Sequence, residues 1–359
     1  MKAAVLREWN QPLEIENISV SKPGPREILV RTVATGVCHS DLHIQDGTYR
    51  ITPLPAVLGH ESAGVVEQVG SDVRSVKPGD HVVTCISAFC GECEPCLTGR
   101  MAICQSAETQ RGEGEEPRLS QANTKALVNQ GGILAAFAEY MLIPDHACVA
   151  IRKDMPLDRA ALIGCAVATG VGAVIHTAGV RPGETVAVIG LSAINGAHIA
   201  GASRIIAIDT QASKLALAKQ FGATDCVDAS TGNPVEQVKE LTSGGVHHSF
   251  EAVGLKVTSE QAFRMLQWGG TATIIGMIPP SEKLEIRGAD FLCEKRLQGT
   301  RMGSNRFPID MPRFVDFYMQ GRLHLDQLIS KRIKLEDING AFDELKQGSL
   351  ARSVIVFDS

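Results

Sequence analysis

The sequence predicts an α/β protein with two domains, one rich in short strands and one built on a parallel sheet. Short apolar segments separated by turn residues fill the first half of the chain, whereas strand-like and helix-like segments alternate from about residue 167. Such alternation is typical of βαβ units. The chain has 359 residues, which is long for one core and favours two domains.

The first half is predicted to form an antiparallel or barrel-like β domain. Turn signals such as Lys-Pro-Gly-Pro at 22–25 and Lys-Pro-Gly-Asp at 77–80 separate its strands. Residues 105–131 are polar, and we expect an irregular loop there, because loops of that length are usually functional or mobile. The predicted strands are AAVL (3–6), ILVRTVATGV (28–37), AGVVEQVG (63–70) and HVVTC (81–85).

The second half is predicted to form the parallel sheet, with helices between its strands. One helix follows the first strand of this half, and another runs through KLALAKQF (214–221). The chain then closes with helical segments at 314–321 and 342–348 and a strand at 353–357. The predicted strands of the sheet are TVAVIG (185–190), RIIAID (204–209), DCVDA (225–229), HHSFEAVG (247–254) and TATIIGM (271–277).

Composition and charge exclude some classes of function. The net charge is −5 and no stretch is a run of Lys or Arg, which argues against nucleic-acid and anionic-membrane partners. The N-terminus lacks the apolar core of a signal peptide, so we expect a cytoplasmic protein. Residues 160–180 carry no Asp, Glu, Lys or Arg, but their four glycines favour a buried helix over a membrane span.

Four of the ten cysteines stand close together, with the spacing C-x2-C-x2-C-x7-C, in CGECEPCLTGRMAIC. Thiols at this spacing can converge on one ion, and four thiolates make a closed tetrahedral zinc site of structural character. Iron–sulfur ligation is an alternative, because part of the spacing is similar to cluster motifs. A second alternative is that these cysteines are a group of surface thiols that bind no metal. The four residues are Cys90, Cys93, Cys96 and Cys104.

Two further segments, GVCHSDLHIQDG (36–47) and LGHESAG (58–64), are weak signals when each is taken alone, and so is the lone Cys165. An isolated His or Cys is usually a core residue. Taken in order with the cysteine cluster and the late βαβ unit, however, they resemble the zinc-containing medium-chain alcohol dehydrogenases. The resemblance runs over essentially the whole chain. It implies a GroES-like β-barrel catalytic domain at 1–166 and 301–359, with a structural zinc lobe at about 85–135, and a doubly wound Rossmann domain at 167–300.

The resemblance also implies a catalytic zinc site. Cys38, His60 and Cys165 match its three ligands, which leave the fourth position open for water or substrate. The other matches are Ser40, which accepts the alcohol proton; His43, the base that passes it to solvent; Asp41, which orients His60; and Glu61, an acid beneath the metal. A plain surface histidine is the alternative for His43. Cys85, Cys148, Cys226 and Cys293 match no ligand position and are interpreted as ordinary thiols.

The cofactor implied by the resemblance is NAD. Asp209 ends the second strand of the βαβ unit, where a carboxylate binds the adenosine ribose and repels a 2′-phosphate. Further cofactor contacts are implied for His39, Thr169, Gly190, Lys214, Val253 and Arg352, although each can also be ordinary surface chemistry.

One stretch, VAVIGLSAINGAHIAGASRIIAID (186–209), departs from the family pattern. The family usually has G-L-G-G-V-G-L before the helix, whereas here Leu191 runs directly into Ser192. Inserting GGVGL between them restores the pattern. A true deletion predicts a short helix capped by Ser192 and poor NAD affinity, because the glycines that allow close approach of the pyrophosphate are gone. The alternative is that the residues are absent only from the sequence as written.

The sequence therefore predicts an enzyme that interconverts an alcohol with an aldehyde or ketone, using NAD and two zinc ions per chain. Ser40, smaller than the Thr also found at this position, leaves room for bulky or aromatic substrates. We expect a homodimer or homotetramer. Two alternatives are a zinc-stabilised homologue that no longer catalyses, because its cofactor loop is truncated, and a polyol dehydrogenase. Cys165 argues against the latter, which usually has a carboxylate there.

Overall fold

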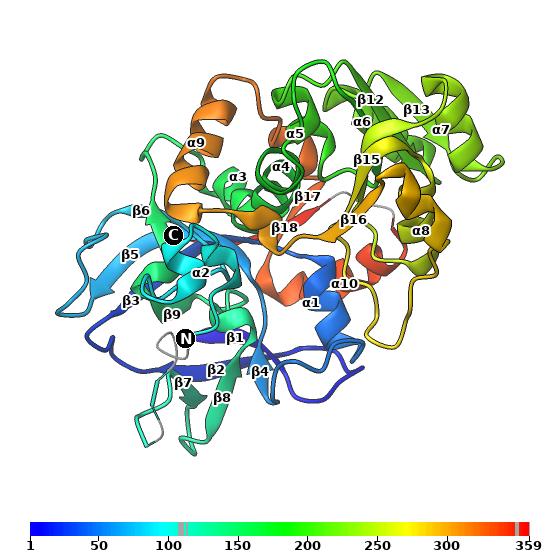
Figure 1. Cartoon of the computed structure of the whole chain (residues 1–359). Helices are drawn as coiled ribbons and strands as arrows, with labels where there is room; N and C mark the ends of the chain where they lie inside the picture. The colour runs from blue at the N-terminus through cyan, green and yellow to red at the C-terminus, as the bar shows by residue number, and fades with distance from the viewer. Residues whose placement is uncertain (107–110, 113, 349–351, 359) are drawn as a thin grey trace. The chain divides into compact units, whose positions relative to one another are not determined.

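The computed structural model describes the chain except for residues 107–110, 113, 349–351 and 359 (Figure 1). The chain forms two compact units. Unit 1 comprises Met1–Ala166, Arg306–Met319 and Leu325–Ser359, and unit 2 comprises Val167–Asn305 and Gln320–His324. Each unit is described separately below.

A small closed barrel occupies the N-terminal part of unit 1. Its first two strands pair antiparallel, with Lys2 opposite Asn17 and Val5 opposite Glu14. The barrel follows the order β1-β2-β7-β8-β4, and its strands are β1 (Lys2–Leu6), β2 (Glu14–Val20), β4 (Ala56–Val57), β7 (Leu119–Gln121) and β8 (Leu127–Gln130).

The prediction that residues 105–131 are irregular is wrong for β7 and β8, and its residues 107–110 and 113 lie outside the described residues. Pairing explains the difference: β7 bonds to β2 and to β8, and β8 bonds to β4. Leu119 and Val128 are buried as a result. Two short strands with so few apolar residues give little signal in the sequence, because their neighbours in the barrel stabilise them.

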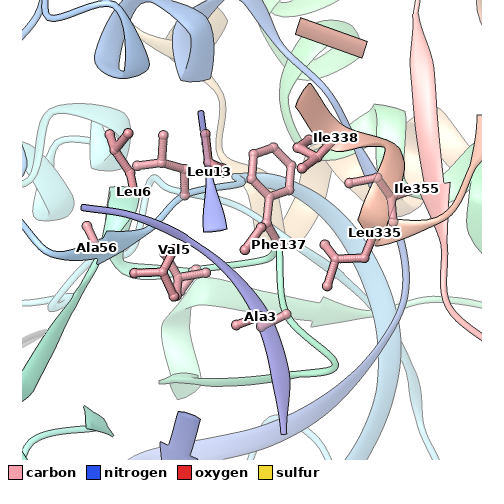
Figure 2. Packing of buried hydrophobic residues seen from close by; sticks show 14 of the residues in the cluster. Ala3, Val5, Leu6, Leu13, Ala56, Phe137, Leu335, Ile338 and Ile355 are labelled. Carbon is pink, nitrogen blue, oxygen red and sulfur yellow. The ribbon is translucent and has the colours of Figure 1, made fainter. Parts of the chain in front are cut away.

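The core of this barrel also receives side chains from the C-terminal end of the chain. Figure 2 shows Phe137 among Leu13, Ile338 and Ile355. The Phe137 ring also meets that of Phe342 edge-on, with centroids 6.2 Å apart. Complete burial of a Phe side chain stabilises the fold by roughly 1.5–3 kcal/mol, so these contacts fasten the C-terminal segment to the barrel.

A second sheet of unit 1 has seven strands, with the order β10-β6-β5-β3-β18-β17 and β9 paired to β3. Its longest strand, β3, pairs with β5 so that Gly36 lies opposite Glu61, and with β18 so that Gly36 lies opposite Val354. This register brings three distant segments of sequence together. The strands are β3 (Glu27–Gly36), β5 (Glu61–Val69), β6 (His81–Thr84), β9 (Tyr140–Pro144), β10 (Cys148–Ala150), β17 (Lys331–Ile333) and β18 (Ser353–Val356).

The described part of unit 1 contains the α-helices α1 (His39–Gln45), α2 (Glu94–Leu97), α3 (Leu157–Leu162), α9 (Phe307–Met319) and α10 (Ile338–Lys346). A continuous helical segment, Leu157–Ala178, begins with α3 and carries the chain into unit 2. This segment is long and apolar enough to cross a membrane, but 72% of its most apolar window is buried within the protein. The buried helix expected for 160–180 is confirmed.

Unit 2 is built on a six-stranded parallel sheet with the order β13-β12-β11-β14-β15-β16, and every neighbouring pair in it is parallel. This is the order of a doubly wound dinucleotide-binding fold, and it reverses direction between β11 and β14. The predicted fold class is confirmed. The strands are β11 (Thr185–Ile189), β12 (Arg204–Asp209), β13 (Asp225–Asp228), β14 (Val246–Glu251), β15 (Leu266–Ile274) and β16 (Arg296–Gly299).

The helices of unit 2 are α4 (Ala168–Gly172), α5 (Ile194–Ile199), α6 (Ala212–Gln220), α7 (Pro234–Thr242) and α8 (Lys256–Arg264). The tight turn and short helix expected after the first strand are confirmed, since α5 has six residues. Ser192 is not its cap, however. The cap position is Ala193, and no side chain caps the helix. The Oγ of Ser192 is instead buried, and it has no hydrogen-bond partner among the described residues.

Candidate metal centre and active site

Three side chains from distant parts of unit 1 converge into one group. Cys38 follows β3 and precedes α1, His60 precedes β5, and Cys165 follows α3. All three are buried, and their donor atoms lie within 4.8 Å of one another. The Sγ of Cys165 is 3.3 Å from the Nε2 of His60. A sulfur and a nitrogen that share a tetrahedral zinc ion are about 3.5 Å apart, so the spacing fits this metal.

The imidazole of His60 is held from behind by Asp41. The Oδ1 of Asp41 lies 3.0 Å from the Nδ1 of His60 and also accepts a hydrogen bond from the backbone amide of Gly59. Since the carboxylate accepts the proton on Nδ1, Nε2 is left as the atom that faces the two thiols. Such carboxylate–histidine pairs fix the ring of a metal-binding histidine.

Burial lowers the pKa of His60, but the carboxylate of Asp41 and the thiolate of Cys38 outweigh burial and hold this pKa well above its ordinary value. The pKa of Cys38 is well below its ordinary value, because Cys165 donates to the sulfur and the charge of Arg352 favours the thiolate. The pocket therefore favours an anionic sulfur, which is the form that binds metal.

Glu61 is fully buried beside this group. Its Oε1 accepts the backbone amide of Ala166, and its Oε2 lies 3.5 Å from the Nε of Arg352. Burial raises the pKa of Glu61 to about 7, although Arg352 opposes the shift. A Cβ at position 36 would collide with the carboxyl group of Glu61, so glycine allows this group to pack closely against β3. Arg352 also donates to the carbonyl of Val37, so its guanidinium lies beside the three-donor group.

The short helix α1 carries the residues predicted for proton transfer. The hydroxyl of Ser40 is 3.8 Å from the Sγ of Cys38. His43 stands one turn further along the same helix, with its Nδ1 3.9 Å from Asp46 and its ring 6.2 Å from that of Tyr49. His39 is the first residue of α1 and is exposed. The structure thus places Ser40 next to the three-donor group and His43 on the same helix.

The four clustered cysteines form a second, separate group within one short segment. Their sulfur separations are 4.0 Å (Cys90–Cys96), 3.4 Å (Cys93–Cys96), 3.7 Å (Cys93–Cys104) and 3.7 Å (Cys90–Cys104). Sulfurs at about 2.3 Å from a tetrahedral centre are about 3.8 Å apart, so the geometry fits one zinc ion with no open position.

Backbone amides explain part of this local geometry. The amides of Glu92 and Cys93 both donate to the sulfur of Cys90 and lower its pKa to about 6. The loop around Cys90 is therefore arranged to hold a thiolate. The cysteines interpreted as ordinary thiols, Cys85, Cys148, Cys226 and Cys293, belong to neither donor group.

The residues predicted to contact the cofactor lie in both units. In unit 2, Asp209 ends β12 and its Oδ1 accepts the amide of Gln211, while Lys214 stands on α6. Thr169 on α4 donates its hydroxyl to the sulfur of Met302. Val253 follows β14 and is 46% exposed, which leaves its side chain accessible to a ligand. Gly190 has φ +98° at the end of β11.

Sequence reasoning missed Glu251, a fully buried carboxylate at the end of β14. Its Oε1 accepts hydrogen bonds from the amides of Val253 and Gly254 and from the hydroxyl of Thr258. Glu251 therefore fixes the turn that carries Val253. The available signal was an acidic residue at the end of a predicted strand, at the sheet edge where ligands bind in such folds.

Comparison with known proteins agrees with the fold and the donor groups. The sequence model described as an alcohol dehydrogenase GroES-like domain matches residues 24–153, and the one described as a zinc-binding dehydrogenase matches residues 188–319. Among curated relatives, a probable S-(hydroxymethyl)glutathione dehydrogenase 1 of Schizosaccharomyces pombe is 38% identical over 99% of this chain and 96% of its own length. A class-3 alcohol dehydrogenase of Myxine glutinosa is 37% identical over 99% and 97%.

Solved structures show the same relationship. An alcohol dehydrogenase zinc-binding domain protein from Burkholderia ambifaria superposes with a TM-score of 0.94 at 34% identity, covering 100% of this chain and 99% of the other. A benzyl alcohol dehydrogenase from Acinetobacter calcoaceticus superposes with a TM-score of 0.92 at 33% identity, covering 99% of both chains.

The fold and the donor groups thus define a zinc-type dehydrogenase. The chain belongs to the zinc-containing medium-chain alcohol dehydrogenase family, as the resemblance in the sequence implied.

Proposed function

We propose that this protein oxidises primary or secondary alcohols, aromatic alcohols among them, to aldehydes or ketones at a zinc ion held by Cys38, His60 and Cys165. The observation that carries the proposal is the convergence of these three buried donors, with Asp41 holding the ring of His60. A two-sulfur, one-nitrogen donor set leaves one position of a tetrahedral zinc ion open. When bound, zinc would act as a Lewis acid toward the alcohol oxygen.

The residues of the chain would handle the proton that the alcohol loses. The hydroxyl of Ser40 lies next to Cys38 and would accept this proton. His43 stands one turn away on α1 and would release it to solvent. Asp41 acts through His60, since it keeps Nε2 directed at the thiols. Arg352 lies beside Glu61 beneath the site and favours the ionised form of this carboxyl group.

We propose that Cys90, Cys93, Cys96 and Cys104 hold a second zinc ion, which stabilises a lobe at about 85–135. Support comes from sulfur separations that suit one tetrahedral ion and from the family, which is described as zinc-binding. Iron is the alternative that the spacing alone leaves open, and elemental analysis separates the two metals.

The hydride acceptor of the family is a nicotinamide dinucleotide. In this chain the residues at one part of the expected cofactor site fit it, and those at another part do not. Asp209 at the end of β12 fits the adenosine ribose and favours NAD over NADP. The turn before α5 does not fit the pyrophosphate, for reasons given below, so no step is derived through the cofactor. We assign residues 167–300 to cofactor binding, and 1–166 with 301–359 to catalysis.

The names of two relatives suggest which class of alcohol is the substrate. One acts by name on benzyl alcohol and another on S-(hydroxymethyl)glutathione. Ser40 beside the donor group favours the former, since a serine leaves more room than a threonine. A panel of ethanol, 2-propanol, benzyl alcohol and S-(hydroxymethyl)glutathione, tested at saturating NAD, decides this. We expect the highest kcat/KM with benzyl alcohol, and no turnover of any alcohol would contradict the proposal.

We further propose that the protein is a cytoplasmic homodimer or homotetramer. Phe291 and Leu292 in unit 2 are 48% and 88% exposed, and β16 is an edge strand of the parallel sheet. Exposed large apolar side chains beside an open sheet edge are typical of a protein interface. Analytical ultracentrifugation tests the proposal, and a monomer at micromolar concentration would contradict it.

A further inference from the structure

The first crossover of a doubly wound sheet is the usual site for the pyrophosphate of a dinucleotide. The charged group sits at the start of the helix that follows the first strand, where free backbone amides point at it. Glycines in the turn allow the backbone to approach closely. In unit 2 this crossover is the segment from β11 through α5 to β12.

The turn of this chain lacks those properties. Gly190 is followed by Leu191, Ser192 and Ala193, and the next glycine is Gly196 inside α5. Helix α5 has only six residues. Its first turn is also closed to solvent, because Ala193 and Ile194 are 0% exposed and Asn195 is 7% exposed.

Contacts within unit 2 account for this burial. A Cβ at Gly170 of α4 would lie 1.8 Å from the carbonyl oxygen of Ser192, so the turn packs directly on α4. The amide of Ile194 is bonded to the carbonyl of Leu191. The side chain of Asn195 donates to the carbonyl of Arg322 and accepts the amide of His324. The start of α5 is therefore occupied by protein contacts.

The neighbouring strand end differs. Asp209 is half-buried at the carboxyl end of β12, where its Oδ1 accepts a short-range hydrogen bond from the Gln211 amide. A carboxylate in this position can bind the two hydroxyls of an adenosine ribose. The ribose end of a cofactor site is thus present, while the first turn of α5, where a pyrophosphate usually lies, is buried against protein.

We propose that this chain binds a nicotinamide dinucleotide through its adenosine end, at Asp209, with almost no contribution from the pyrophosphate, an inference that rests on the proposed function for the identity of the ligand. In a glycine-rich turn the amides would make charge-assisted hydrogen bonds to the phosphates. Each such bond contributes about tenfold or more in affinity, so the loss of two weakens binding by roughly 100-fold.

Calorimetric titration of the purified full-length protein with adenosine and with ADP-ribose tests this directly, because only the second ligand carries a pyrophosphate. We expect the two dissociation constants to differ by tenfold or less. ADP-ribose binding more than tenfold tighter than adenosine would overturn the proposal. So would failure of adenosine to bind at millimolar concentration, because the adenosine end would then not be the anchor.

Two variants sharpen the test. Insertion of GGVGL between Leu191 and Ser192 is expected to tighten ADP-ribose about 100-fold and to leave adenosine unchanged. If this variant does not fold, the ratio of the adenosine and ADP-ribose dissociation constants of the wild type alone tests the proposal. Asp209→Asn is expected to weaken both ligands, whereas the matched control Asp228→Asn, at the end of β13, leaves both unchanged. Equal effects of the two substitutions would contradict the role of Asp209.

The outcome is separable from the proposed function. An insertion variant that binds NADH tightly but oxidises no alcohol of the panel would refute the function and leave this inference standing. A wild-type protein that binds ADP-ribose tightly and oxidises benzyl alcohol would refute the inference and support the function.

Discussion

The two donor groups of unit 1 differ in how the chain builds them. The four cysteines stand within residues 90–104, and three of them are only half-buried. Cys38 and His60 lie 22 residues apart, Cys165 follows more than a hundred residues later, and all three are buried. A local, closed four-sulfur set can be satisfied by one ion without any ligand from elsewhere. A three-donor set, assembled from strands and a helix far apart in the sequence, leaves one coordination position of a tetrahedral ion open for water or substrate.

From this difference we propose that one group contributes stability and the other reactivity. In this proposal the local group holds together a segment with few regular elements, where bound zinc would contribute folding free energy. The distant group is already positioned by β3, β5 and α3, so its metal adds less to the fold. The following predictions test that division, in order of decreasing effect.

Cys38→Ala is expected to lower kcat/KM for alcohol oxidation at least about 10³-fold, because the metal loses an anionic ligand and with it much of the charge stabilisation that it supplies. Thermal unfolding should stay close to that of the wild type. The matched control is Cys226→Ala, a thiol outside both groups, which should keep full activity. If Cys38→Ala kept a tenth of the activity, the three-donor group would not be the catalytic site.

Cys96→Ala is expected to show the opposite pattern. It should lose one metal ion and destabilise the protein by about 4 kcal/mol, a fraction of the free energy with which structural zinc binds. Differential scanning calorimetry with and without a chelator measures this, and Cys293→Ala is the control. An unchanged unfolding temperature in Cys96→Ala would remove the structural role from this group.

Glu27→Gln tests how the segment that follows the four-cysteine group is held. Glu27 at the start of β3 is 6% exposed and accepts hydrogen bonds from Arg111 and Arg118. Breaking a buried ion pair of this kind costs about 3 kcal/mol. The control Glu67→Gln, in an exposed pair with Arg31, should cost less than about 1 kcal/mol. Equal losses of stability at neutral pH would contradict the importance of the buried pair.

The stability that Glu27 contributes is expected to depend on pH. Burial raises the pKa of Glu27, but the hydrogen bonds from Arg111, the Gly24 amide and Arg118 outweigh it and hold the pKa below its usual 4.5. The stabilisation is therefore complete above about pH 4.5 and is lost as the pH falls through the lowered value. The stability difference between wild type and Glu27→Gln should shrink on acidification. A constant difference down to pH 3 would contradict the ion pair as its source.

Asp41→Asn should have the smallest of these effects, because Asp41 acts on the metal only through His60. Loss of such a partner typically weakens metal affinity or activity about 10–100-fold. Competition with a fluorescent zinc chelator measures the affinity of the three-donor group. Asp343→Asn, which changes an exposed carboxylate on α10, is the control. Zinc affinity and activity equal to those of the wild type would show that Asp41 does not position the ring.

The sequence predicted these regions unequally well, for physical reasons. The spacing of Cys90 to Cys104 specified a metal group by itself, because ligands on one short loop must lie close together. Nothing in the local sequence placed Cys165 beside His60, since that contact depends on the register of β3, β5 and α3, and only the family resemblance predicted it. The strands β7 and β8 were missed because barrel neighbours stabilise them.

The turn before α5 likewise shows that sequence reveals local features but not contacts between distant residues. Its departure from the family pattern was evident from the sequence, and so was the shortness of the helix. The packing of Ser192 against Gly170 was not, because the two residues are neighbours only in space. Ser192 was expected to cap the helix and instead lies one position before the cap.

Zinc stoichiometry tests the central claim, that the chain has two separate zinc sites with different roles, most directly. Elemental analysis of the purified protein should give two zinc ions per chain in the wild type. It should give one in Cys38→Ala, which stays folded, and one in Cys96→Ala, which is destabilised. A wild type with one zinc ion, or iron in place of zinc at the four cysteines, would contradict this account.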